Sequence, residues 1–253
     1  MEEELKKEEN VVENEESLDE NVEEVKTPSH RQSRKGLVRK ITTLAMLAAI
    51  AYALAFLGHT LGIHFVPSVP FLSYDPKDIV VCIGGFILGP LGGALISVVV
   101  SFIEMITISS TGFYGFIMNI FSTCSFVVPA ALIYKYRKSF KGALFSLLIG
   151  FVCEILVMTL WNIIITPIYM GVARDVLIKN YLLPIVLFNV IKVGINVGLV
   201  LILYKPIITG LRSIGLIEKG KSKFNLKSTL LMVGIGLFVL ATFAVVVILL
   251  KNS

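Results

Sequence analysis

The sequence predicts an all-α protein, a polytopic membrane helix bundle in which six helices form a core and one more transmembrane helix follows toward the C-terminus. Of its 253 residues, 55% are hydrophobic and 16% are charged, whereas a soluble domain has about a quarter of its residues charged. The mean hydropathy is +0.83. The charged residues gather in clusters, and the apolar runs between them approach the ~20 residues that a helix needs to cross a bilayer.

The first segment differs in composition from the rest of the chain. Residues 1–30 contain 12 of the 18 acidic residues and no aromatic residue, and such a segment cannot bury enough apolar surface to fold alone. We therefore predict a disordered acidic cytosolic tail at 1–30. From residue 31 onward, 20 Lys and Arg face only 6 Asp and Glu. Their separation into clusters excludes a nucleic-acid binder with a continuous basic face.

The uncharged runs predict seven helices, because each run is apolar and bounded by charged or turn-forming residues. They lie near 41–58, 78–90, 93–109, 114–134, 142–168, 181–204 and 229–250. The second run rises only about 20 Å and need not cross the bilayer alone. Gly89 and Pro90 predict a tight turn after it, and the spacing of Gly85, Gly89 and Gly93 by four predicts close helix contact.

The basic residues predict the orientation of the bundle. Fifteen Lys and Arg precede the first helix or follow the fourth and sixth, and four stand on the alternate side. The positive-inside rule therefore predicts a cytoplasmic N-terminus and, after seven spans, an extracellular C-terminus in the cell membrane. The predicted segments are a six-helix membrane domain at 31–210, a basic cytosolic linker at 211–228 and an additional transmembrane helix at 229–253.

One motif match in the linker is not interpreted as a nucleotide site. Residues 215–222 fit the P-loop pattern G-x-x-x-x-G-K-S, which binds phosphates only when a buried strand precedes it and a helix follows. A short linker between two membrane helices offers no sheet. We predict a basic cytosolic loop there instead.

Three charged residues lie within the predicted helices, at Glu104, Glu154 and Lys192. A charge at membrane depth costs at least ~2.5 kcal/mol, so each needs a partner or a function. Lys192 either pairs with Glu154 or Glu104 to hold the bundle together or binds a ligand, and the two roles are compatible. The amides that also need partners are Asn119, Asn162, Asn189 and Asn196.

The amides suit a particular kind of ligand. Asn189 and Lys192 are spaced i, i+3 and project from one helix face. An amide offers two donors and an acceptor, which matches the edge of a planar heterocycle. Asn162 is predicted to bind such a ligand, while Asn119 either does so or joins two helices.

The segment before the second helix carries local signals of its own. Asp75 is placed to cap the helix, Pro76 suits its first position, and Asp78 is placed to complete a capping box. The preceding segment, 59–77, is rich in aromatic residues and proline, which predicts a semi-rigid lid over a cavity. His59 and His64 have no third ligand at suitable spacing, so no metal site is predicted.

The first helix carries small residues at a spacing of four. Ala45, Ala49 and Ala53 form a flat face that lets another helix approach closely. Such a face either packs within the bundle or, if it points outward, forms a docking surface.

Four stretches carry a resemblance to a known family. They are Phe71 to Asp78 (FLSYDPKD), the run GGFILGPLGG at 84–93, the segment 161–169 with its Trp-Asn and Thr-Pro-Ile-Tyr, and Phe188-Asn-Val-Ile-Lys192. Together they resemble the substrate-binding S components of energy-coupling factor (ECF) vitamin transporters, within the riboflavin-specific branch. The resemblance covers about 36–210 and implies a six-helix core with an outer loop over the vitamin. The acidic tail and the seventh helix depart from the pattern.

The resemblance also implies a function. The chain is expected to bind riboflavin outside the cell with high affinity and to deliver it inside as the membrane subunit of an ATP-driven importer. Hydrogen bonds to the isoalloxazine ring are expected from residues 162, 189 and 192, and a contact from the outer loop at residue 74. The expected substrate-binding residues are Tyr74, Asn119, Asn162, Asn189 and Lys192.

Partners follow from the same resemblance. They are riboflavin itself, the lipid bilayer, a transmembrane coupling subunit and two ATPases, with docking through Ala45, Ala49 and Ala53. Riboflavin is the transported substrate, so neither a cofactor nor a catalytic residue is expected, and no nucleic acid is an expected partner.

Three alternatives remain open at the level of the sequence. The same fold could carry another vitamin, such as thiamine, pantothenate or folate. An intramembrane enzyme could use Glu104, Glu154 and the loop histidines, or the polar residues could serve only to join helices.

Overall fold

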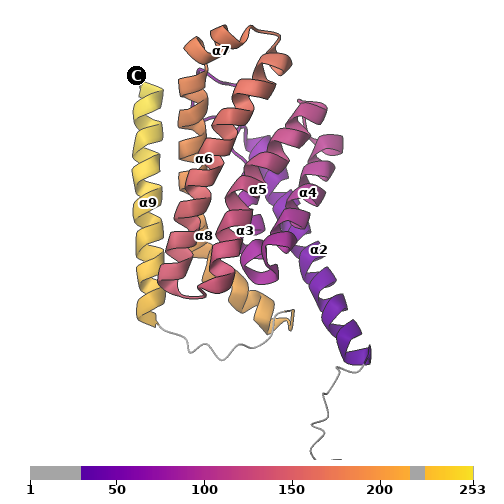
Figure 1. The fold of residues 1–253 in the computed structure, drawn as a ribbon. Helices are drawn as coiled ribbons and strands as arrows, with labels where there is room; N and C mark the ends of the chain where they lie inside the picture. The colour runs from indigo at the N-terminus through magenta and orange to yellow at the C-terminus, as the bar shows by residue number, and fades with distance from the viewer. Residues whose placement is uncertain (1–29, 217–225, 253) are drawn as a thin grey trace, which may run out of the picture. The chain divides into compact units, whose positions relative to one another are not determined.

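The structure, a computed structural model, describes residues 30–216 and 226–252 and is helical throughout most of them (Figure 1). The chain divides into two compact units, 1–38 and 39–253. The helix α2, His30–Leu61, begins in the first unit, and everything below concerns the second. The predicted tail and most of the P-loop match lie outside the described residues.

All seven predicted apolar runs are helices, which confirms the helical class. The helices that follow α2 are α3 (Lys77–Leu88), α4 (Pro90–Thr107), α5 (Gly112–Tyr136), α6 (Phe140–Met170), α7 (Arg174–Asn180), α8 (Leu182–Ser213) and α9 (Leu226–Asn252). Among the described residues, α2 and five of these helices are long and apolar enough to cross a membrane, whereas α3 and α7 are too short. The helix α7 was not predicted.

The α3–α4 hairpin is built on glycine. Gly89 joins the two helices at φ 87°, a left-handed value that favours glycine, and Pro90 occupies the first turn of α4. Gly85 and Gly93 face each other so closely that a Cβ on Gly93 would lie 3.0 Å from the Cα of Gly85. The predicted close contact is therefore confirmed for this pair, whereas Gly89 makes the turn.

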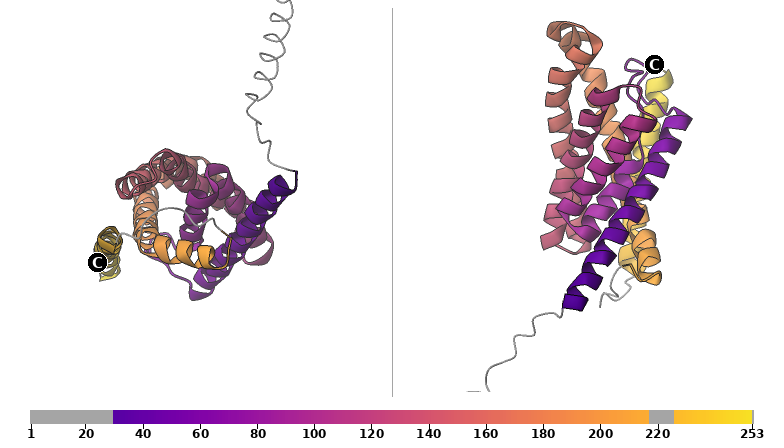
Figure 2. Two further views of the ribbon diagram at one scale, coloured as in Figure 1. Left: turned by 90° about the horizontal axis from the view of Figure 1, so that it is seen from below. Right: turned by 90° about the vertical axis from the view of Figure 1, so that its right-hand side faces the viewer.

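The short helix α3 lies at the centre of the bundle. It packs against α4, α5 and α8, and every residue from Lys77 to Gly85 is buried. The longer helices surround it when the bundle is viewed along its axis (Figure 2, left). As a result, the two charged residues that begin α3 are enclosed by the other helices.

Basic residues lie at one end of the bundle. Arg39 Nε donates to the Leu216 carbonyl, 2.8 Å away, so the start of this unit lies beside the end of α8. The α5–α6 turn, with its Lys and Arg, lies at the same end, which is lowest in Figure 1. Which side of the membrane this end faces stays a prediction.

The C-terminal helix α9 packs on the outside of α8 (Figures 1 and 2). The two helices approach at Gly198 and Gly236, where a Cβ on Gly236 would lie 2.7 Å from the Gly198 carbonyl oxygen. Only 6% of the most apolar stretch of α9 is buried against the rest of the protein, so most of this helix is left to face lipid. Its last turns, including Phe243 and Val246, pack against the apolar cluster that contains Tyr74 and Phe188.

Candidate functional site

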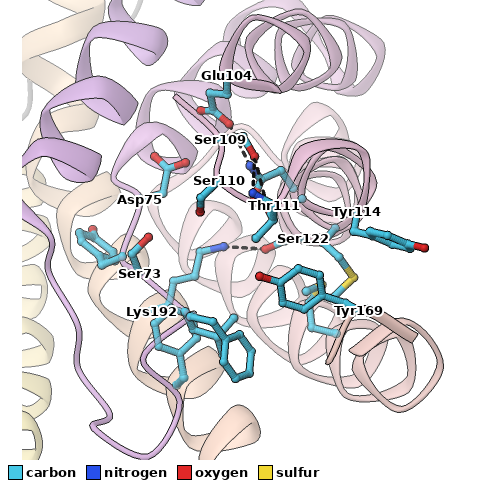
Figure 3. Close-up of a pocket in the computed structure, with 18 of the residues that line it drawn as sticks. Ser73, Asp75, Glu104, Ser109, Ser110, Thr111, Tyr114, Ser122, Tyr169 and Lys192 are labelled. Carbon is cyan, nitrogen blue, oxygen red and sulfur yellow. Dashed lines mark hydrogen bonds between the residues drawn. The ribbon is translucent and has the colours of Figure 1, made fainter. Parts of the chain in front are cut away.

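A cavity of about 200 Å³ opens at the α7 end of the bundle, between the segment 71–75, the α4–α5 turn and helices α5, α6 and α8 (Figure 3). The five residues expected from the sequence to bind substrate come from four different stretches of chain. The structure brings all of them to this one cavity: Tyr74, Asn119, Asn162, Asn189 and Lys192.

Aromatic side chains form one wall of the cavity. The ring centroid of Tyr169 lies 6.2 Å from that of Tyr114 and 6.5 Å from that of Phe71, and Phe188 lines the same space. Figure 3 shows Tyr114 and Tyr169 together on one side of Lys192. Such a wall suits the faces of a flat apolar ring system.

Lys192 lies between two carboxylates and a hydroxyl. Its Nζ is 2.9 Å from Asp78 Oδ2 and 3.3 Å from Glu154 Oε1, and it donates to Ser122 Oγ at 2.6 Å. Pairing with Glu154 was one of the two predicted partnerships. The stronger contact, with Asp78, was not predicted.

The capping role predicted for Asp78 is wrong. Its carboxylate is fully buried, accepts a hydrogen bond from Thr123 Oγ1 at 2.6 Å and pairs with Lys192. Both groups lie on other helices. The side chain therefore points into the bundle, away from the backbone N–H groups that a capping residue would bind at the start of α3. Asp75 Oδ1 accepts the Lys77 backbone N–H at 2.9 Å, but α3 begins one residue later than predicted, with Pro76 rather than Asp75 at the N-cap position.

Lys77 forms a second buried ion-pair group. The sequence placed it with the basic residues outside the membrane, yet its side chain is only 2% exposed. Its Nζ lies 2.5 Å from Asp75 Oδ2 and 2.5 Å from Glu104 Oε2. Glu104, a predicted candidate partner of Lys192, therefore pairs with Lys77 instead.

The three cavity amides are held in different ways. Asn162 Nδ2 donates to the Met158 carbonyl at 2.7 Å, and Asn189 Nδ2 donates to the Ile185 carbonyl at 2.9 Å. Each of these nitrogens carries a second hydrogen that can reach a ligand. Asn119 Nδ2 instead donates to Glu104 Oε2 at 2.9 Å and so joins α5 to α4.

Tyr74 connects the segment before α3 to the Lys192 group. Its hydroxyl donates to Asn196 Oδ1 at 2.9 Å, and Asn196 Nδ2 in turn lies 3.3 Å from Asp78 Oδ2. Burial, together with the nearby Asp78 carboxylate, raises the pKa of Tyr74 above its usual value. The phenol therefore stays protonated and keeps its role as a donor.

The segment between α2 and α3 folds back onto the bundle. Phe65, Val66 and Val69 are buried in the cluster that includes Tyr74, and Tyr74 N–H donates to the Ile63 carbonyl at 2.8 Å. His64 Nδ1 lies 3.0 Å from the Leu72 carbonyl. In the described part of the chain, no three His, Cys, Asp or Glu side chains gather as a metal site.

The alanines of α2 divide into two faces. Ala51 and Ala55 are buried in the bundle, whereas the three alanines singled out from the sequence are exposed. These are Ala45, Ala49 and Ala53. The outward alternative predicted for this face is therefore the one that the structure contains, although its use for docking stays a prediction.

Comparison with known proteins agrees with this architecture. A family model described as the substrate-specific component of ECF transporters matches residues 39–204. A solved S component of a bacterial ECF transporter is similar with a TM-score of 0.59 and 26% identity, covering 72% of this chain and 99% of that chain. The helix α9 lies beyond the part that the family model matches.

Curated relatives point in the same direction. The riboflavin transporter RibU of Staphylococcus aureus (strain TCH60) is 29% identical over 65% of this chain and 87% of its own. The riboflavin transporter FmnP of Bacillus subtilis (strain 168) is 28% identical over 70% and 97%. These relatives are transporters rather than enzymes, which removes the intramembrane-enzyme alternative. The chain belongs to the family of substrate-specific components of ECF transporters.

Proposed function

We propose that this chain is the riboflavin-binding subunit of an ECF importer and that the cavity beside Lys192 is its riboflavin site. One observation carries the proposal: five residues expected from scattered stretches of sequence to bind riboflavin line a single cavity. The similarity to two riboflavin transporters supports the identity of the cargo.

The chemistry of the cavity suits the isoalloxazine ring. The pyrimidine-like edge of the ring presents carbonyl acceptors and one N–H donor, which Asn162 and Asn189 can match because amides both donate and accept. Lys192 already contacts Asp78, Glu154 and Ser122. To donate to a ring carbonyl it exchanges one of these partners, and the Ser122 hydroxyl is the neutral one.

The size of the cavity has a consequence for binding. Its volume of about 200 Å³ is below the roughly 300–1,000 Å³ of typical ligand sites. A flavin therefore enters only if lining side chains move aside. Tyr114 and Tyr169 are exposed, so they are the side chains that can do so at least cost.

Transport requires other subunits in this proposal. A membrane coupling subunit and two ATPases supply the energy, and the exposed face of Ala45, Ala49 and Ala53 is the docking surface. The basic end of the bundle faces the cytoplasm, so the cavity end faces outward and the C-terminus is extracellular. Riboflavin is cargo and leaves the chain unchanged.

The test is a titration of riboflavin fluorescence with detergent-purified protein. We expect saturable quenching that is weakened at least about tenfold by Asn162→Ala and by Lys192→Ala, because each removes a polar contact with the ring. The matched control is Asn180→Ala, an exposed amide at the end of α7, which should bind riboflavin normally.

Absence of quenching by folded protein would overturn the assignment of riboflavin. A panel of thiamine, pantothenate and folate would then identify the cargo, because the same fold with another vitamin is one of the alternatives that the sequence leaves open. Equal weakening by Asn180→Ala and Asn162→Ala would place the binding site elsewhere.

A further inference from the structure

Oxygen atoms gather on the wall of the cavity formed by α4 and the α4–α5 turn. Glu104, Ser109, Ser110 and Thr111 line this wall, and Asp75 lies beside it. Figure 3 shows these side chains together above the Lys192 side chain, with Tyr169 to its right. The wall is thus distinct from the amides and the aromatic rings that suit a flavin ring.

Glu104 has one carboxylate oxygen that is engaged and one that is free. Oε2 accepts from Lys77 Nζ at 2.5 Å and from Asn119 Nδ2 at 2.9 Å. Oε1 is buried and has no hydrogen-bond partner among the described residues. The side chain is 3% exposed, and a buried polar atom without a partner is costly. Oε1 is therefore a buried, unpartnered acceptor on a side chain that lines the cavity.

Lys77 and Asn119 decide where that acceptor points. Both bind the same oxygen of Glu104, one from the start of α3 and one from α5. Two donors on one oxygen fix the plane of the carboxylate and leave the other oxygen without a partner. A hydroxyl donor on a bound ligand would satisfy this oxygen.

We propose that Glu104 Oε1 accepts a hydrogen bond from a hydroxyl of the ribityl chain and that this wall is the polyol subsite. The inference rests on the proposed function and deepens it. The ribityl chain is the part of riboflavin that carries neutral hydroxyl donors, and a carboxylate is a strong acceptor for them. Lys77 and Asn119 are positioning residues, since they act through Glu104.

The test compares two ligands that share one ring. Riboflavin and lumiflavin differ in that lumiflavin carries a methyl group in place of the ribityl chain. Glu104→Gln keeps an oxygen toward Lys77 and Asn119 but turns the open position into an N–H donor. We expect the Kd for riboflavin to rise at least about tenfold and the Kd for lumiflavin to change less than about threefold.

Glu154→Gln is the matched control. Glu154 is also a buried carboxylate paired with a lysine, but it does not line the cavity. Because it acts on Lys192 and hence on the ring, we expect it to shift the Kd for both ligands in parallel. Asn119→Ala keeps the Glu104 carboxylate and frees its orientation, so it should weaken riboflavin selectively by a smaller factor.

Equal effects of Glu104→Gln on the two ligands would overturn the inference while leaving the riboflavin site intact. If that variant bound neither ligand, Asn119→Ala would decide, and a parallel shift of both ligands would again overturn it. Failure of the unaltered protein to bind either flavin would instead overturn the proposed function.

Discussion

Lys77 and Lys192 share four carboxyl groups in the interior of the bundle. Lys77 contacts Asp75 and Glu104, and Lys192 contacts Asp78 and Glu154. A lone charge at this depth would be expensive, and each lysine avoids that cost by lying between two opposite charges. Asp75, Glu104 and Lys192 line the cavity, so residues that hold the bundle together also form the proposed binding site.

Replacing Asp78 should destabilise the protein. Asp78→Ala removes the shorter of the two carboxylate contacts to Lys192 and leaves Thr123 without its acceptor. Breaking a buried ion pair from one side costs about 3–5 kcal/mol. We expect a clear fall in the thermal unfolding midpoint in detergent.

The control for this variant is Asp175→Ala. Asp175 lies in the first turn of α7 and is exposed, where a carboxylate contributes at most about 1 kcal/mol. Similar midpoints for the two variants would show that Asp78 is not structurally important.

The sequence predicted some of these charged residues and missed others for a physical reason. Glu104, Glu154 and Lys192 stand inside apolar runs, so their cost is visible without a structure. Asp78 and Lys77 stand where a helix begins, and local spacing there looks the same whether the helix starts in water or in the bundle. Only contacts with α4, α5 and α8 distinguish the two cases.

At the level of elements, length and composition predicted the helices well. The shortness of α3 and the turn at Gly89 were both visible in the sequence. The helix α7 was not, because a seven-residue helix is marginal alone and is fixed here by the buried side chain of Leu177. The stability of α7 comes from packing against the rest of the protein, which cannot be predicted from the seven residues alone.

The close contact between α8 and α9 predicts how a substitution at Gly236 changes stability. A Cβ on Gly236 would lie 2.7 Å from the Gly198 carbonyl oxygen, which is backbone and cannot move aside cheaply. Gly236→Ala should therefore push α9 from α8 and lower the thermal unfolding midpoint by several degrees, of the order expected for about 1–3 kcal/mol.

Gly234→Ala is the matched control on the same helix. Nothing lies within 4 Å of a Cβ at Gly234, and alanine favours a helix over glycine by up to about 1 kcal/mol. This variant should keep the midpoint or raise it slightly. A loss of stability as large as that of Gly236→Ala would contradict the close packing.

In the second unit, α9 packs along α8, and residues 39–61 of α2 lie apart from α9 when the bundle is viewed from below (Figure 2, left). The additional helix therefore leaves the exposed face of Ala45, Ala49 and Ala53 uncovered. Of the proposed partners, the coupling subunit is the one that needs such a flat surface within the membrane.

A bulky residue on this face should block assembly and leave binding intact. We expect Ala49→Trp to reduce co-purification with the co-expressed coupling subunit and ATPases at least about tenfold, because a large side chain keeps the helices apart. Riboflavin quenching by the isolated variant should be unchanged. Leu156→Trp, on the exposed face of α6, is the control for added bulk, and equal loss of assembly in both would contradict docking through α2.

The two ion-pair groups are also separated in the order of synthesis. Lys77 meets Glu104 within the α3–α4 hairpin, so that pair is available soon after the ribosome has made the third core helix. Among the described residues, the ion-pair partner of both Asp78 and Glu154 is Lys192, which enters the bilayer only with α8. A nascent chain thus holds two acids without this partner until its last core helix is inserted, and the proposed binding site is completed together with the core of the fold.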